Sequence, residues 1–346
     1  MSVSKIVEEY MPYCAVRGHE EAYLKAIAEH LTRVGEVEVK HHYALCRIKG
    51  RKSNKTILIL AQGTTPGYQA GEIKENGAVR MYPVDDAGCR TPLTWIEPFK
   101  PVDAETFSKR VTIYSDRKID AVVPAPPVHY QYSVGKLAKA DGMYAVSGYT
   151  KQQLEEMICP GDAITYTPYL QHLLNGRFFA PFLAYRIAPA AILCLAEKLI
   201  AHSPEYDTVL AVTGGSYFSG ATRVTEQISP DELILLTFAA EESYKGDGVA
   251  EGVRINQFFG SAVNYPYSEK LEHYFTENGY RHSRLASLVN TNTPADECTY
   301  LGKGIPTAMF GVPVKYPNSS VSVVQESEVE YLVDALTHYL THEEEA

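Results

Sequence analysis

The stretch Thr208-Val-Leu-Ala-Val-Thr-Gly-Gly215 indicates the fold class, because a run of apolar and β-branched residues ends abruptly in two glycines. Such a run is typical of a buried strand whose carboxyl end opens into a loop. Comparable runs occur at 56–61, 233–238 and 307–312. Helical periodicity appears between and around them, near 19–34, 188–201, 268–278 and 328–341. The alternation predicts an α/β domain with a mixed or parallel sheet covered by helices on both faces.

The stretch from about 66 to 174 has a different pattern, with many prolines and little helical periodicity apart from 150–158. A short β-like segment lies at 110–114. We interpret this stretch as a β-rich domain inserted after an early strand of the α/β domain. The predicted organisation is a discontinuous α/β domain, residues 1–65 and 175–346, that carries an inserted domain at 66–174. The last predicted helix opens with Ser327 and Glu330 at the spacing of a capping box.

The charge balance restricts the classes of partner. The chain of 346 residues has 32 basic and 42 acidic side chains, a net charge of −10, and no run of Lys or Arg, which argues against nucleic acid. No window reaches the ~18 apolar residues of a membrane span, and the N-terminus has no apolar core of signal-peptide length. The six cysteines form no Cys-x-x-Cys pair and indicate buried or idle thiols. We therefore expect a cytoplasmic protein without nucleic acid or membrane as partner.

Familiar catalytic motifs are missing from the sequence. It has no Walker loop, no Gly-x-Gly-x-x-Gly after a strand, no Gly-x-Ser-x-Gly elbow and no His-Glu-x-x-His. His338 and His342 are four residues apart on the predicted terminal helix, a spacing that can place two imidazoles on one face. Because no glutamate base or third ligand accompanies them in the sequence, we interpret them as part of a solvated face.

Segments that follow predicted strands carry a family resemblance. Ligands bind outside the carboxyl ends of strands in α/β folds. The relevant segments are Leu60-Ala-Gln-Gly-Thr-Thr-Pro-Gly67, Thr213-Gly-Gly-Ser-Tyr-Phe-Ser-Gly-Ala221, Thr237-Phe-Ala-Ala-Glu-Glu242 and Val314-Lys-Tyr-Pro-Asn-Ser-Ser320. With Gly18-His-Glu20, Pro126-Pro-Val-His129, Pro160-Gly-Asp162 and Gly304-Ile-Pro-Thr307, their order resembles the tetrahedral, or glutamyl, aminopeptidase family of dinuclear metallopeptidases. The resemblance covers nearly the whole chain and implies a mixed-sheet, zinc-exopeptidase-like (phosphorylase/hydrolase-like) fold with a small barrel-like insertion.

The resemblance does not extend to the metal ligands. Where the family has Ala-His-x-Asp-Glu-x-Gly this chain has Ala61-Gln-Gly-Thr-Thr-Pro-Gly67, so Gln62 stands at the histidine position. The arginine after the bridging aspartate is matched by Arg186, but Ala184 stands at the aspartate itself. The Glu-Glu pair falls on Gly214 and Gly215.

The remaining ligand positions are also changed. The aspartate at the end of the next strand falls near Thr237, and the final histidine falls on Asn318. A catalytic zinc normally keeps three protein ligands from His, carboxylate or thiolate. We therefore expect no metal, no cofactor and no catalytic residue at this site, and a vacated pocket. Its predicted residues are Gln62, Thr64, Ala184, Tyr185, Arg186, Gly214, Gly215, Ser216, Thr237 and Asn318.

Two classes of function follow from these substitutions. The chain is either a homologue without metal-dependent peptidase activity, acting as a structural or regulatory subunit or binding a peptide or small molecule, or an active metallo-aminopeptidase-like hydrolase with a rebuilt site. Ser216 and Cys298 are the candidate nucleophiles for a metal-free reaction. A rebuilt metal site would draw on Glu241, Glu242, Asp247, Asp296 and Glu297, with His129 or His172.

The resemblance also implies assembly. The family forms dimers through its inserted domain and closes them into tetrahedral dodecamers. We therefore expect a homo-oligomer, from a dimer up to a tetrahedral dodecamer, or a hetero-oligomer with an active paralogue.

Overall fold

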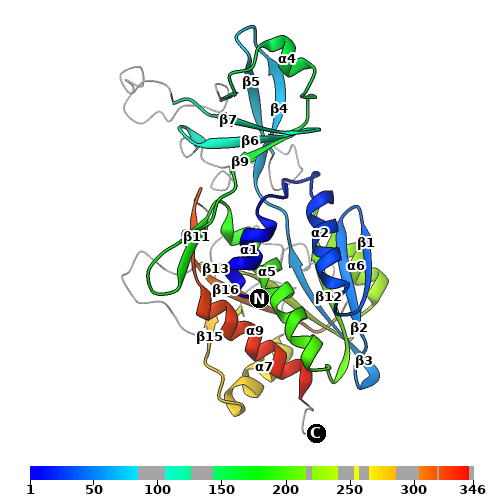
Figure 1. The fold of residues 1–346 in the computed structure, drawn as a ribbon. Coiled ribbons are helices and arrows are strands. Elements are labelled where there is room, and N and C mark those ends of the chain that lie inside the picture. Colours follow the sequence, from blue (N-terminus) through cyan, green and yellow to red (C-terminus); the bar gives the residue numbers. More distant parts are fainter. Residues whose placement is uncertain are drawn as a thin grey trace.

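A large mixed sheet forms the centre of the protein (Figure 1). The computed structural model describes residues 1–84, 106–125, 143–215, 220–240, 253–256, 265–285, 304–317 and 319–342. Within these residues the sheet has eleven strands, most of them in the order β1-β2-β12-β3-β13-β16-β17-β11-β10, with β14 beside β16 and β15 beside β14. Their bounds are β1 Glu36–Lys40, β2 Tyr43–Ile48, β3 Lys52–Gln62, β10 Gln171–His172, β11 Arg177–Ala180, β12 Tyr206–Thr213, β13 Glu232–Ala240, β14 Val253–Asn256, β15 His282–Leu285, β16 Thr307–Lys315 and β17 Ser322–Gln325.

The predicted apolar runs form the parallel centre of this sheet. β3 pairs in parallel with β12 on one side and with β13 on the other, and β13 pairs in parallel with β16. These strands are buried on both faces, which explains why their sequences are continuously apolar. Because they run in the same direction, their carboxyl ends meet at one edge, which positions the site described below.

Helices cover both faces of the sheet, as predicted. On one face, residues of α1, α2, α5, α7 and α9 share a core with Ile59, Leu210 and Ile234 of the central strands. On the other face, Ala221 and Val224 of α6 pack against Leu58 and Leu235. The helices are α1 Val3–Tyr10, α2 Glu21–Leu31, α4 Lys151–Glu155, α5 Leu183–Ala201, α6 Gly220–Ile228, α7 Tyr265–Glu277 and α9 Glu326–Thr341.

The predicted start of α9 is wrong. Gln325 is the N-cap residue and makes no capping hydrogen bond through its side chain, and Ser327 already lies inside the first turn. The reason is that β17 ends at Gln325, so the chain passes from strand to helix without a linker in which a capping box could form. The Glu326 carboxylate instead accepts hydrogen bonds from the backbone N–H and hydroxyl of Ser4 in α1.

The inserted β domain is a closed six-stranded barrel, drawn above the sheet in Figure 1. Its strands follow the order β4-β5-β8-β7-β6-β9, and its interior holds Tyr68, Met81, Ile113 and Ile164. The barrel confirms the predicted small barrel-like insertion, whereas the boundaries at 65/66 and 174/175 stay predictions. The strand bounds are β4 Gly67–Ile73, β5 Ala78–Val84, β6 Arg110–Tyr114, β7 Lys118–Val122, β8 Tyr144–Val146 and β9 Ala163–Tyr166.

The described cysteines are free thiols, as the sequence indicates. Burial raises the pKa of Cys14 and of Cys46 to about 11, so both stay protonated at neutral pH. Cys89 and Cys298 lie outside the described residues. Across the described ranges, every helix is too short or too polar to span a membrane.

Candidate functional site

A row of polar side chains lies at the carboxyl ends of the central strands. Thr213 at the end of β12 is in register with Gln62 at the end of β3, and Thr237 of β13 follows the residue opposite Ala61. Their neighbours Ala61, Val212 and Leu236 point into the core shared with α5. Because side chains alternate along a strand, Gln62, Thr213 and Thr237 point to the face covered by α6. The hydroxyl of Thr237 is buried without a hydrogen-bond partner.

Glu20 is the charged residue that the sequence analysis missed. It precedes α2, its side chain is almost completely buried at 2% exposure, and its Oε1 accepts two hydrogen bonds. The hydroxyl of Thr64 donates over 2.9 Å and the backbone N–H of Gly215 over 2.8 Å. Glu20 thus connects two of the positions that the resemblance assigns to the vacated pocket.

The glycine pair leaves space that Glu20 fills. A Cβ added at Gly214 would lie 3.2 Å from the Cβ, Cγ and Cδ atoms of Glu20, closer than an ordinary van der Waals contact. Gly215 has a φ of 91°, a left-handed conformation that side chains other than glycine rarely adopt. A pair of glutamates at 214 and 215 therefore requires Glu20 to move and the backbone to change.

Arg186 points away from the polar row. Its Nη2 donates to the carbonyl oxygen of Tyr13 over 2.9 Å, and its guanidinium carbon lies 4.5 Å from the ring centroid of Tyr23. Its buried Nη1 has no hydrogen-bond partner, and beside it lies a cavity of about 10 Å³ that Tyr10 and Tyr23 help to line. That volume is about the size of one water molecule and too small for a ligand.

Tyr185 takes a different direction from its neighbour. Its ring packs edge-on against Phe238, next to Thr237, with centroids 5.5 Å apart. Ala184 is buried in the core. Of the predicted pocket residues, the structure therefore brings Gln62 and Thr237 to one region and Thr64 and the glycine pair to Glu20. Tyr185 packs on the opposite face of the sheet, which α5 covers, and Arg186 faces the N-terminal segment. Ser216 and Asn318 lie outside the described residues.

The donor set at these positions does not fit a dinuclear zinc centre. These positions offer an amide, hydroxyls, an alanine and two glycines, whereas zinc prefers imidazoles, carboxylates and thiolates. In the part of the chain that the structure describes, no three His, Cys, Asp or Glu side chains come close enough to hold a metal ion together. His172 lies on β10, at the far end of the strand order from β3. Outside the described residues lie His129, Glu241, Glu242, Asp247, Asp296 and Glu297.

Fold and site together define a zinc-exopeptidase-like α/β protein with an inserted barrel. The chain belongs to the M42 glutamyl aminopeptidase family, whose model matches residues 44–334.

Solved structures of aminopeptidases share the fold over almost the full chain. The aminopeptidase of the archaeon Desulfurococcus kamchatkensis is 16% identical with a TM-score of 0.82, covering 99% of this chain and 95% of that one. The TET aminopeptidase of Thaumarchaeota archaeon SCGC AB-539-E09 is 15% identical with a TM-score of 0.85, covering 98% and 96%. The TET1 peptidase of Pyrococcus horikoshii, which assembles into a tetrahedron or a large octahedral shell, is 17% identical with a TM-score of 0.81, covering 99% and 100%. At these identities the likeness shows the fold alone.

Proposed function

We propose that this family member has lost metal-dependent peptidase activity and acts in the cytoplasm as a structural or regulatory subunit, or as a binding protein for a peptide or small molecule. The observation that supports the proposal is the position of Glu20, whose side chain fills the space beside Gly214. A general base or a metal ligand must present a free carboxylate to the reacting groups. The Glu20 carboxylate is buried and already accepts hydrogen bonds from Thr64 and Gly215.

The polar row suits a neutral ligand better than a cation. The Gln62 amide both donates and accepts hydrogen bonds, and so do the hydroxyls of Thr213 and Thr237. Gln62 is half-buried at the open end of β3, and the unpaired Thr237 hydroxyl lies beside it. A peptide amide or a small molecule with hydroxyl or carbonyl groups matches these side chains.

The experiment is an aminopeptidase assay combined with metal analysis. The full chain, purified without chelator, is incubated with amino-acid p-nitroanilides in the presence of Zn²⁺, Co²⁺ or Mn²⁺. We expect no turnover with any of the three ions. Turnover that co-elutes with the protein and disappears on chelation contradicts the proposal, and turnover rather than metal content is decisive because a metal can bind elsewhere on the chain.

The second candidate function is an active hydrolase acting on peptides or amides with a rebuilt metal site. It is favoured by the course of β13, whose carboxyl end at Ala240 lies at the same sheet edge as Gln62, and by the sequence, in which Glu241 and Glu242 come next. If the assay finds chelator-sensitive turnover, Glu241→Gln and Glu242→Gln should abolish it. Glu277→Gln, at the carboxyl end of α7, is the matched control and should leave it unchanged.

A homo-oligomer is the assembly we propose for this chain, because similar solved structures include a dodecamer and a peptidase that can assemble into a tetrahedron or a large octahedral shell. The dimer-to-dodecamer range and a mixed assembly with an active paralogue are parts of the same proposal. A subunit without catalytic activity can still have a structural role in such an assembly, because its fold forms the contacts between subunits.

A further inference from the structure

Strand β1 is an open edge of the large sheet. It stands first in the strand order and, among the described residues, pairs with β2 alone (Figure 1). The two-residue turn between these strands makes Lys40 and Tyr43 a hydrogen-bonded pair, and such pairs alternate along an antiparallel ladder. The first, third and fifth residues of β1 therefore bond to β2, whereas the backbone N–H and C=O groups of Val37 and Val39 point to the open side.

The shape of β1 leaves this edge available for pairing. Natural edge strands are commonly blocked by proline, by a bulge or by charged side chains. The sequence of β1, Glu-Val-Glu-Val-Lys, contains no proline, and its register with β2 is regular over all five residues. Val39 is 38% exposed. The charged side chains are thus the feature that decides whether another strand can pair here.

The free backbone groups select one register for the pairing of two copies. Two β1 strands related by a two-fold axis run antiparallel. When Val37 of one copy lies opposite Val39 of the other, the strands form two hydrogen-bonded pairs, whereas either valine opposite its own copy gives one such pair within the strand. In the favoured register Glu38 lies on the axis.

The charges of β1 are complementary in this register. Glu36 lies opposite the partner subunit's Lys40, and the two-fold axis repeats the contact. Opposite charges directly across an antiparallel pair are stabilising. Glu38 lies opposite its own copy, but its carboxylate is balanced within each chain: Arg47 Nη1 lies 3.3 Å away, and it accepts hydrogen bonds from the Tyr43 hydroxyl at 2.9 Å and from Gln227 at 2.7 Å.

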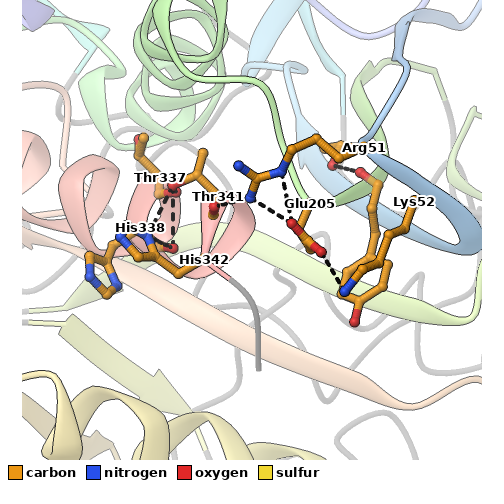
Figure 2. A network of polar contacts seen from close by, with 9 residues as sticks. Arg51, Lys52, Glu205, Thr337, His338, Thr341 and His342 are labelled. Carbon is orange, nitrogen blue, oxygen red and sulfur yellow. Dashed lines mark hydrogen bonds and ion pairs between the residues drawn. The ribbon is translucent and has the colours of Figure 1, made fainter. Parts of the chain in front are cut away.

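Basic residues at the start of β3 show the contrasting arrangement. In Figure 2 the side chains of Arg51 and Lys52 both contact the Glu205 carboxylate, at 2.8 Å from Arg51 Nε and 2.7 Å from Lys52 Nζ. These charges are paired within one chain and select no partner. Glu36 has no ion pair among the described residues, and the ammonium group of Lys40 is as far as 3.9 Å from Glu38. A second copy would supply both with close partners.

We propose that β1 is an interaction surface for a second copy of this chain, whose own β1 pairs with it antiparallel about a two-fold axis so that the two sheets become continuous. The inference rests on the homo-oligomer proposed above and names a surface for it. This surface differs from the inserted domain, through which the resemblance implies dimers.

Reversal of the charges is the first test, with association of the full chain measured by sedimentation velocity over a range of concentrations. Lys40→Glu and Glu36→Lys should each weaken association by about tenfold or more, because each places like charges opposite one another twice. The double variant restores opposite charges and should associate like the wild type. Lys5→Glu, an exposed change of the same sign on α1, is the control for net charge and should leave association unchanged.

A cross-link tests the register. The Cα atoms of a non-hydrogen-bonded antiparallel pair are about 4.5 Å apart, within the range of a disulfide. Glu38→Cys should therefore give a disulfide-linked dimer on mild oxidation. Lys40→Cys is the matched control, since the two copies of residue 40 would lie about 14 Å apart along the strands. The wild type gives the background from the exposed Cys159.

Either of two results would overturn the proposal. One is a folded Glu38→Cys variant, checked by circular dichroism, that forms no more linked dimer than Lys40→Cys. The other is a double charge variant that associates no better than the single ones. If either is found while the wild type is still oligomeric, the homo-oligomer stands and uses another surface. A monomeric wild type contradicts both proposals.

Discussion

At the scale of single residues, Glu20 holds the sheet edge together. Its carboxylate connects Thr64 after β3 with the backbone of Gly215 after β12. Among the described residues, the Thr64 hydroxyl and the Gly215 N–H donate to no other acceptor. Removing a buried carboxylate that accepts two hydrogen bonds is costly. Each donor is then left without an acceptor and, because it is buried, without water to replace it.

Glu20→Ala should therefore lower the free energy of unfolding by about 2–4 kcal/mol, the cost of leaving the Thr64 hydroxyl and the Gly215 N–H without their acceptor. Urea denaturation followed by circular dichroism measures this change. Glu21→Ala is the control, since Glu21 is the exposed neighbour and forms ion pairs with Lys25 and His41 at the surface. Equal denaturation midpoints for the two variants would show that the Glu20 contacts do not stabilise the fold.

Glu20 also shows why the candidate site was only partly predictable. The sequence suggests Gln62, Thr64 and the glycine pair, because they follow strands that are recognisable from local apolar runs. It cannot reveal the contacts of Glu20, whose partners Thr64 and Gly215 are 44 and 195 residues away. One feature of the sequence could have indicated this contact. A glutamate, Glu20, precedes a predicted helix, and glycines stand at 214 and 215, the positions that the resemblance matches to a pair of glutamates.

At the scale of elements, Glu232, the first residue of β13, connects a neighbouring strand with two helices through its side chain. The Glu232 carboxylate pairs with Lys55 at 2.8 Å and accepts hydrogen bonds from the hydroxyls of Tyr267 and Tyr339 at 3.0 and 2.9 Å. These partners come from β3, α7 and α9. Burial acts to raise the pKa of Glu232, but the hydrogen bond and charge of Lys55, together with Lys270 and Tyr339, outweigh it and lower the pKa below its ordinary value.

A lowered pKa in the folded state has a definite consequence for acid stability. The unfolded chain binds a proton at Glu232 more readily than the folded chain, so the stabilisation is complete above the ordinary glutamate pKa and is lost as the pH falls through the lower folded value. Glu232→Gln should thus be less stable than the wild type at pH 7, and the difference should shrink below about pH 4. Thermal unfolding at pH 3.5, 5 and 7 checks this, and a difference that is constant across the series would contradict it.

Elements were predicted well where the sequence of the element itself determines them, and poorly where contacts with distant residues do. The runs at 56–61 and 307–312 fall inside β3 and β16 because a strand buried on both faces is apolar throughout. The start of α9 was wrong because the pairing of Gln325 with Arg177 of β11 decides where strand gives way to helix. The short α4 has the capping box instead, between Thr150 and Gln153.

At the scale of the whole molecule, the barrel and the sheet are distinct bodies of structure connected by short segments. β3 ends at Gln62 and β4 begins at Gly67, and the chain returns from β9 at Tyr166 towards β10 at Gln171. The first and last barrel strands, β4 and β9, are paired with each other, so the chain enters and leaves the barrel at the same place. The insertion therefore closes without interrupting the sheet.

Assembly is the prediction that belongs to this scale. We expect light scattering at micromolar concentration to give a mass of at least twice the 38.4 kDa chain, because oligomers recur among structures of this fold. Co-expression with an active family member tests the mixed assembly, with a tag on only one of the two chains. A monomer in the first measurement contradicts homo-oligomer formation, and recovery of the tagged chain alone contradicts the mixed complex.

The central position of β3 has a consequence for biosynthesis. Its sheet neighbours β12 and β13 begin only at Tyr206 and Glu232, so the ribosome must add more than a hundred residues before either edge of β3 can pair. At about 5–20 residues per second this takes roughly seven to thirty seconds, during which an apolar strand is without its partners. The barrel, whose strands all pair among themselves, can close in that interval. During this interval the apolar half of β3, Ile57–Ala61, is exposed on the nascent chain, and an unpaired apolar strand is prone to aggregation until β12 and β13 have been made.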